Sequence, residues 1–243
     1  MIVIDHRDTT AWIGINTGRP GNAMHAAAMS ELADAVEQAA GNSKTSLLVL
    51  YSERTSFCAG ADVSVLEHAS PEQFWAYAEL QTRLFEIVDR APALTVAALR
   101  GACIGAGAEL AMCCDLRVAG AELRFGYPEV RLGFPVNPTR LTRAVGAGFA
   151  NELIFSAELA DAQTCLRRGV VNHLIPAGDW LTGIEAAIAP YTGLDRNAVV
   201  HTKLAAYEVK QPKPDAAMFG SLLAMSVRAS RLPPRIDDTE TES

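Results

Sequence analysis

The sequence lacks basic clusters and long apolar runs, and these absences exclude two classes of protein. Its 21 lysines and arginines face 28 aspartates and glutamates, so the net charge is -7. Nucleic-acid binding needs a basic patch for phosphate contacts, and none is present. Every apolar stretch falls short of the roughly 20 residues that a membrane helix needs. The start, MIVIDHRDTT, lacks the pattern of a secretory signal. We therefore expect a cytoplasmic protein with no nucleic-acid and no membrane partner.

Cysteine is scarce and unevenly placed. The five cysteines are odd in number and form no CxxC pair, and Cys113 and Cys114 adjoin within an apolar run. Such thiols are typical of free, buried cysteines rather than of disulfides or a metal site. The histidines at 68, 173 and 201 are scattered, which indicates neither a catalytic triad nor a metal centre. We predict no metal.

What the sequence does have is a large apolar fraction arranged in two periods. Hydrophobic residues make up 49% and charged residues 20% of the 243 positions, enough to bury a core. Alternating patterns predict a hairpin around Asp8-Thr9, and apolar runs predict buried strands at 46–52 and 94–99. Helical spacing predicts helices over 24–40 and from Ser70-Pro71 to about 91. Strands that alternate with helices indicate an α/β fold.

The C-terminal part of the sequence has helical periodicity. From about Asn137 onward, apolar residues recur at helical spacing, and the run from Asp195 to Arg228 is the longest of these patterns. The last residues, DDTETES, are polar and acidic, which is typical of a disordered tail. This helical third could cover the core or form a subunit interface.

The stretch GACIGAGAELA, residues 101–111, has three possible interpretations. As a dinucleotide loop it fails, because the GxGxxG pattern begun at Gly105 needs glycine or alanine where Leu110 stands. Interpretation of the stretch as a tight packing turn explains the glycines. That interpretation does not explain Glu109, a carboxylate among apolar neighbours that is costly to bury without a partner or a role. The helix dipole offsets only about 0.3–1 kcal/mol of that cost.

A second glycine-containing loop favours the third interpretation, an active site that uses backbone amides. SFCAGADVS, residues 56–64, follows one predicted strand as 101–111 follows the other. Loops at the carboxyl ends of neighbouring parallel strands can direct their N–H groups into one crevice. Two such groups aimed at a carbonyl oxygen form an oxyanion hole, worth roughly 2.7–4 kcal/mol per donor.

With these motifs the sequence resembles the crotonase (enoyl-CoA hydratase/isomerase) superfamily over most of its length. The family's FCAGAD stands at 57–62, its glycine-rich element at 101–111, and its FGxPE element as FGYPE at 125–129. The segment RPGNAM, 19–24, resembles its acyl-CoA-binding turn. The three core motifs keep the family's order and spacing.

The resemblance implies a crotonase-like ββα spiral core with a helical C-terminal region. The core with the acyl-CoA site would span 1–190. Residues 191–236 would form the helical region that covers the site or makes oligomer contacts, and 237–243 would be the disordered tail. The family assembles as homotrimers, often paired into hexamers, and we expect one of these states.

The resemblance also implies roles for particular residues. The amides of Ala61 and Ala106 would form the oxyanion hole for a thioester carbonyl, with Ala106 standing where the family usually has glycine. Glu109 would hold and activate a water, and Glu129 would donate a proton. The remaining substrate-binding residues would be Ala23, Ala59, Asp62, Val63 and Gly105.

These residues favour an enoyl-CoA hydratase, which adds water across the 2,3 double bond of a 2-enoyl-CoA. Coenzyme A would enter as part of the substrate, and no further cofactor is expected. A non-catalytic acyl-CoA-binding protein, an enoyl-CoA isomerase and an acyl-CoA hydrolase on the same fold stay open as alternatives.

Three segments depart from the family pattern. The family usually follows FGxPE with xxLGxxPGxGGTQRL, where this sequence has the shorter VRLGFPVNPTRL without the glycine cluster. The loop TGRPGNAM is also short, and the C-terminal SVRASRLPPRI keeps only prolines and basic residues of the family pattern. The first of these segments lies beside the acyl pocket in the family fold, so the acyl chain is left open.

Overall fold

The structure is a computed structural model that describes residues 1–62 and 69–210. Val63 and the chain beyond Lys210, which includes most of the predicted region 191–236 and all of 237–243, lie outside the described residues. Among the helices described, none is long and apolar enough to cross a membrane.

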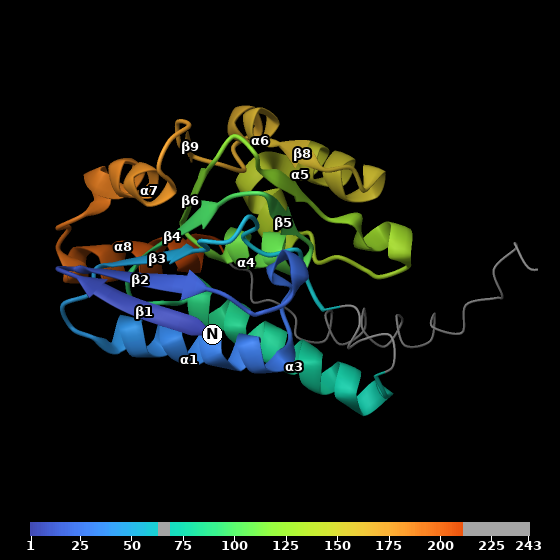
Figure 1. The fold of residues 1–243 in the computed structure, drawn as a ribbon, viewed down its shortest axis with the longest axis horizontal. Helices are drawn as coiled ribbons and strands as arrows, with labels where there is room; N and C mark the ends of the chain where they lie inside the picture. Colours follow the sequence, from blue (N-terminus) through green and yellow to red (C-terminus); the bar gives the residue numbers. More distant parts are fainter. Residues whose placement is uncertain (63–68, 211–243) are drawn as a thin grey trace, which may run out of the picture.

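The centre of the fold is a six-stranded, mostly parallel sheet (Figure 1). Its order is β1 (Ile2–Arg7), β2 (Thr10–Ile15), β3 (Leu47–Tyr51), β4 (Leu94–Leu99), β6 (Leu116–Ala119) and β9 (His173–Leu174). Only β1 is antiparallel to its neighbour, in the hairpin predicted around Asp8-Thr9. The predicted neighbours β3 and β4 pair in parallel, with Leu47 opposite Leu94. Their carboxyl ends therefore meet at one edge of the sheet.

Both faces of this sheet are covered, which explains why β3 reads as a continuous apolar run. All five of its residues are buried. Leu48 and Leu50 join the core that includes α1 (Ala26–Gly41), α3 (Pro71–Asp89) and α4 (Ala106–Cys113). Leu47 and Val49 face the opposite core, to which Ile184 of α7 (Trp180–Ile188) contributes. Burial of alternate residues on both sides is characteristic of a parallel sheet between helices.

Helices α1 and α3 lie side by side along one face of the sheet (Figure 1). Both were predicted, and α3 begins as expected: the Ser70 hydroxyl accepts a hydrogen bond from the Gln73 amide, and the Gln73 side chain accepts one from the Ser70 amide. This reciprocal pair satisfies two amides that the first helical turn leaves without partners. The second helix therefore starts at the position that its sequence specifies.

A smaller sheet carries the glycine-rich stretch. Its order is β5 (Ala102–Ile104), β7 (Arg124–Gly126) and β8 (Ala160–Asp161). The strand β5 is not among the predicted elements; it pairs in parallel with β7 before α4 begins. A three-residue strand depends on its partner, which lies about twenty positions away, and leaves little local pattern.

The C-terminal part is helical as predicted, with two short strands added. It contains α5 (Thr139–Ser156), α6 (Ala162–Arg168), α7, a 3-10 turn η3 (Ala189–Tyr191) and α8 (Arg196–Lys210). Gly146, at φ 78°, divides α5 into two helical pieces. The two-residue strands β8 and β9 were not predicted, because they arise from pairing with β7 and β6.

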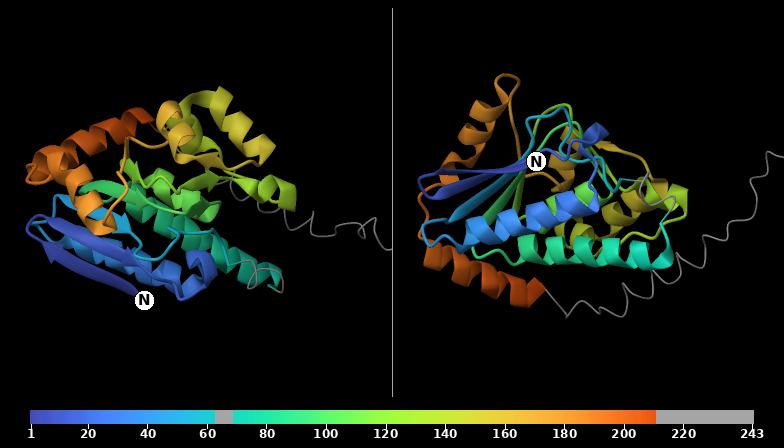
Figure 2. Two further views of the ribbon diagram at one scale, coloured as in Figure 1. Left: turned by 45° about the horizontal axis from the view of Figure 1, so that its top comes forward. Right: turned by 60° about the horizontal axis from the view of Figure 1, so that its bottom comes forward.

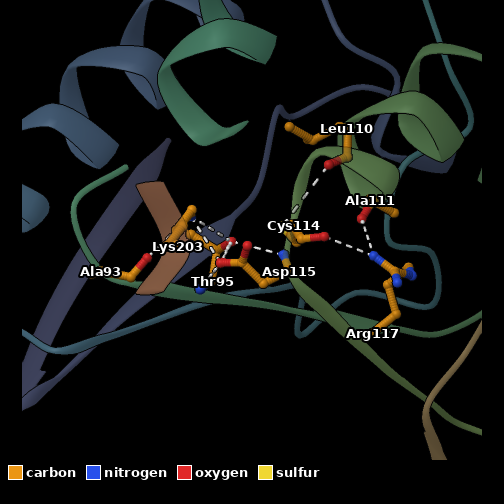
Figure 3. Close-up of polar contacts among 8 residues, drawn as sticks. All are labelled: Ala93, Thr95, Leu110, Ala111, Cys114, Asp115, Arg117 and Lys203. Carbon is orange, nitrogen blue, oxygen red and sulfur yellow. Dashed lines mark hydrogen bonds and ion pairs between the residues drawn. The ribbon is translucent and has the colours of Figure 1, made fainter. Parts of the chain in front are cut away.

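Two cations tie the helices to the amino-terminal side of the sheet (Figure 3). Lys203 of α8 lies 2.8 Å from Asp115 and donates to the Ala93 carbonyl, and Asp115 in turn accepts from the Thr95 amide and hydroxyl. Arg117 donates to the Cys114 carbonyl at the end of α4. Figure 1 and the right-hand view of Figure 2 show α8 toward the left of the molecule and α5 toward the right. Helix α8 therefore lies away from the carboxyl ends of the strands.

Candidate active site

The loop from Phe57 to Asp62 and the start of α4 lie against one another at the carboxyl ends of β3 and β4. Cys58 exchanges backbone hydrogen bonds with β5, since its amide donates to Ala102 and its carbonyl accepts from Ile104. A β-carbon at Gly60 would lie 3.0 Å from the Ile104 carbonyl oxygen and 3.7 Å from the Ala106 nitrogen. The two glycine-containing loops thus converge, as expected for loops that follow neighbouring parallel strands.

The amides of Ala61 and Ala106 are the two expected oxyanion donors. The neighbours of Ala61 are bonded, because the Gly60 carbonyl accepts from the Met24 amide and the Asp62 amide donates to the Met24 carbonyl. Ala106 is the first residue of α4, where the helix supplies no acceptor. Within residues 1–62 and 69–210, neither the Ala61 nor the Ala106 N–H donates a hydrogen bond. Both are therefore available to a ligand.

Glu109 is a buried carboxylate with two polar partners. Its side chain accepts a hydrogen bond of 2.7 Å from Arg140 Nη1 at Oε1, and Tyr127 Oη lies 3.5 Å from Oε2. Burial raises the pKa of Glu109, and the Arg140 guanidinium opposes that rise. Burial also raises the pKa of the Tyr127 hydroxyl, which therefore stays a neutral donor. The partner that the sequence left unknown for Glu109 is thus an arginine.

Glu129 differs from Glu109 in its surroundings. Within the described residues, its Oε2 atom is buried and has no hydrogen-bond partner. Burial, with a smaller effect from the charge of Glu109, raises the pKa of Glu129 from 4.5 to about 6. Burial thus raises the pKa of both carboxyl groups, and an arginine opposes that rise only at Glu109.

A pocket of about 150 Å³ contains both glutamates and the Ala106 end of the expected oxyanion hole. Its walls come from α3, the start of α4, the FGYPE motif and the segment 135–140. They are Gln81, Thr82, Phe85, Glu86, Gly105, Ala106, Glu109, Tyr127, Glu129, Pro135, Val136, Asn137 and Arg140. The segment that departs from the family pattern thus lines the pocket.

The other expected substrate-binding residues gather beside the first loop. Ala59 donates its amide to the Gly21 carbonyl, which places it next to the turn that contains Ala23. Asp62 is buried and lies 3.1 Å from Arg19 Nε, an ion pair that joins this turn to the loop. Gly105 lies in the pocket wall. Val63 is outside the described residues.

Three residues with evident roles in the geometry were not identified from the sequence: Tyr127, Arg140 and Asp89. Tyr127 stands inside the FGYPE motif, but only the motif's glutamate was assigned a role. Arg140 belongs to the altered segment. The one feature that could have identified it is that Arg140 and Leu141 match the Arg-Leu pair that ends the family's TQRL. Asp89, the last residue of α3, carried no signal and lies 3.3 Å from Arg140 Nη2.

A sequence model of the family described as enoyl-CoA hydratase/isomerase matches residues 6–216. The chain belongs to that family. Crotonyl-CoA hydratase of Syntrophomonas wolfei is 31% identical over 221 residues, which are 89% of this chain and 85% of that protein. Short-chain-enoyl-CoA hydratase of Clostridium acetobutylicum is 30% identical over 178 residues, which are 72% and 68% of the two chains.

Solved structures of the enoyl-CoA hydratase/isomerase family share the fold. The enoyl-CoA hydratase from Bacillus anthracis superposes with a TM-score of 0.82 at 24% identity, covering 93% of this chain and 89% of that one. A putative enoyl-CoA hydratase/isomerase family protein from Hyphomonas neptunium gives 0.81 at 25% identity, covering 94% and 89%. The predicted crotonase-like α/β fold is thereby confirmed.

Proposed function

We propose that this protein is an enoyl-CoA hydratase that adds water across the 2,3 double bond of a 2-enoyl-CoA thioester. The observation that carries the proposal is the pair of carboxyl groups, Glu109 and Glu129, in one pocket beside the free amide of Ala106. Hydration needs a held water, a proton donor and a site for negative charge on the thioester oxygen. The pocket offers one group for each.

The proposed reaction assigns each of these groups a step. The thioester oxygen accepts hydrogen bonds from the amides of Ala61 and Ala106, which stabilise the negative charge that develops as the enolate forms. Ala106 opens α4, so the helix dipole adds to that stabilisation. The water oxygen bonds to C3 while Glu129 delivers its proton to C2. The proton that the water loses returns to Glu129 and restores the acid.

The division of labour between the two glutamates follows from their environments. Glu109 is paired with Arg140, which favours a carboxylate that accepts a hydrogen bond from the water. A carboxylate oxygen has two lone pairs, so Glu109 can bind water while it keeps its protein partners. Glu129, with a pKa of about 6, is protonated in a useful fraction of molecules near neutral pH.

The pocket favours a short acyl group. Its volume is about 150 Å³. Its walls include the polar side chains of Gln81, Thr82 and Asn137. The names of the relatives, crotonyl-CoA hydratase and short-chain-enoyl-CoA hydratase, agree with a short chain. The proposed chemistry uses only groups of this chain, and coenzyme A enters as part of the substrate. The family resemblance implies that the enzyme assembles as a trimer or a hexamer.

Double-bond isomerisation is a second candidate, and one observation favours it. Glu129 Oε2 has no hydrogen-bond partner among the described residues. A single free carboxylate can remove a proton from one carbon of an acyl chain and return it to another, so this reaction needs no water. The family name covers both activities.

The test is an assay of the purified protein against trans-2-enoyl-CoAs of increasing chain length. We expect loss of the ultraviolet absorbance of the conjugated thioester, fastest for the four-carbon substrate. Product masses separate the reactions: hydration adds one water, isomerisation leaves the mass unchanged, and hydrolysis releases free coenzyme A. A Glu129→Gln variant should lose about 100-fold or more in kcat.

Folded wild-type protein that binds acyl-CoA but consumes no enoyl-CoA of any length would refute the hydratase proposal and favour a binding protein. A product of unchanged mass would favour the isomerase. Thiol release would favour a hydrolase.

A further inference from the structure

Arg140 lies between two carboxylates that come from different helices. Its Nη1 is 2.7 Å from Oε1 of Glu109 in α4, and its Nη2 is 3.3 Å from Oδ2 of Asp89 at the end of α3. The Arg140 and Asp89 side chains are each 17% exposed and that of Glu109 is 9% exposed. The guanidinium also lies over the ring of Phe85, 5.8 Å from its centre. This is a mostly buried, braced cation.

We propose that Arg140, braced by Asp89, is a positioning residue that holds Glu109 as an oriented anion in the pocket. The inference rests on the proposed hydratase function, because it explains how one of two nearby glutamates is kept charged and aimed at the water.

The charges around Glu109 show why a cation is needed there. Asp89, Glu86 and Glu129 approach the site from α3 and the FGYPE motif, and all are acidic. Among the described residues that line the pocket, Arg140 is the one cation. Without it, Glu109 would be a buried charge surrounded by like charges, and it would bind a proton instead.

The uncharged neighbours of Glu109 do not neutralise the negative charge of its carboxylate. Burial raises the pKa of both the Tyr127 hydroxyl and the Cys113 thiol well above their ordinary values. Both groups therefore stay neutral and can donate, but they cannot compensate a carboxylate. Burial raises the pKa of Glu109, and Arg140 is the group that most opposes this rise, so the proposed anionic state of Glu109 depends on Arg140.

The geometry fixes the orientation of Glu109 as well as its charge. Arg140 holds Oε1, and Tyr127 lies 3.5 Å from Oε2, so the plane of the carboxylate is constrained from both sides. Nε and Nη2 of Arg140 both approach Asp89 Oδ2, at 3.4 and 3.3 Å, while Nη1 reaches Glu109. The planar fork of arginine can bridge two carboxylates in this way, and the single ammonium of lysine cannot do so equally well.

The location of Arg140 links this role to the altered segment. It is the second residue of α5, which begins at Thr139, directly after the pocket-lining residues 135–137. The shortened loop therefore also determines where Arg140 stands relative to Glu109.

The experiment compares Arg140→Gln, Arg140→Lys and Asp89→Asn with Arg143→Gln, an exposed arginine on the same helix as the matched control. The pH profile of kcat on crotonyl-CoA is measured for each. Arg140→Gln should lower kcat by about 100-fold with little change in KM. Its acidic limb should move to higher pH, because Glu109 then binds a proton more readily. Arg140→Lys should recover part of the loss, and Arg143→Gln should match the wild type. Asp89→Asn should move the acidic limb slightly to lower pH, because it removes a negative charge that raises the pKa of Glu109.

A second readout does not depend on turnover. Infrared spectra of Arg140→Gln and of Arg140→Gln with Glu109→Gln, taken across pH, isolate the carbonyl stretch of protonated Glu109. In each background, the band of protonated Glu109 is the difference between the spectra with and without Glu109→Gln. We expect this band to persist to higher pH in the Arg140→Gln background than in the wild-type background. If Arg140→Gln does not fold, Arg140→Lys supplies the same comparison with a smaller shift.

An unshifted acidic limb and an unshifted Glu109 band in the folded variants would overturn the inference even if the wild type is an active hydratase. Conversely, an inactive wild type whose Glu109 band still shifts on loss of Arg140 would refute the hydratase proposal and leave the electrostatic role of Arg140 intact.

Discussion

The carboxylate of Glu129 lies directly over Gly105, in the space that a side chain at position 105 would fill. Gly105 has a positive φ of 54° and leads into α4, which carries Glu109 four positions later. Its amide donates to the Gly126 carbonyl, which fixes the FGYPE motif beside the helix start. Gly105 therefore lets the two glutamates share one pocket.

Substitution of Gly105 by alanine should displace Glu129. The added methyl group would overlap Oε1 of Glu129, and alanine would be strained at the positive φ. We expect destabilisation of about 1–2 kcal/mol and a loss of turnover of about 100-fold. Urea denaturation and the enoyl-CoA assay measure these two effects. Gly133→Ala, also at positive φ but with open space around it, is the control that carries strain without the clash. Equal turnover in the two variants would contradict this account.

The stability difference between the wild type and Glu129→Gln should depend on pH. The pKa of Glu129 is raised from 4.5 to about 6, so folding favours its protonated form. The stabilisation of the folded state by protonated Glu129 is fully present below about pH 4.5 and is lost as pH rises through about 6. The change of about 1.5 units corresponds to about 2 kcal/mol relative to the glutamine variant. Urea denaturation of both proteins from pH 4 to 8 measures this; a pH-independent difference would show that Glu129 has an ordinary pKa.

Deletion of one backbone N–H tests the oxyanion hole. Ala106 is the first residue of α4, where proline is well tolerated because its missing N–H has no partner in the helix. Ala106→Pro should therefore lower kcat by about 100-fold or more while the protein stays folded. Ala106→Gly keeps the amide and should stay within about threefold of the wild type. Circular dichroism checks folding, and similar activity in both variants would rule out the Ala106 amide as a donor.

The ion pair between Lys203 and Asp115 should stabilise the protein without affecting catalysis. Their side chains are 11% and 23% exposed and the pair lies at the amino-terminal side of β4, away from the pocket. Lys203→Met should cost about 1–3 kcal/mol, because Asp115 keeps its bonds to Thr95 but loses its counter-charge.

The matched control for Lys203→Met is Arg83→Met, whose pair with Glu37 is more than half exposed on both sides. Its cost should stay below about 1 kcal/mol. Urea denaturation ranks the two variants, and kcat on crotonyl-CoA should be unchanged in Lys203→Met. A larger cost for Arg83→Met, or a loss of activity in Lys203→Met, would contradict the placement of α8.

The sequence predicted most of the elements, because their signals act over a few residues. The capping box at Ser70 and Gln73, the apolar run of β3 and the helical spacing of α1 are local features, and all three elements formed as expected. The cost of burying Glu109 among apolar neighbours was also a local argument, and it correctly indicated that a partner was needed. The short strands β5, β8 and β9 were not predicted, because two or three residues are too few to show the alternation of apolar and polar residues.

What the sequence by itself determined is the α/β fold, the two convergent loops and the positions of Glu109 and Glu129. Only the tertiary structure decided which group accompanies each glutamate. Arg140 is 31 positions from Glu109 and 51 from Asp89, yet packing of α3, α4 and α5 brings the three side chains into hydrogen-bond distance. No periodicity or propensity reports on such a contact, because the ion pair exists only after three helices have packed. The same packing buries Glu129, whose Oε2 atom has no hydrogen-bond partner within residues 1–62 and 69–210, and this burial raises its pKa.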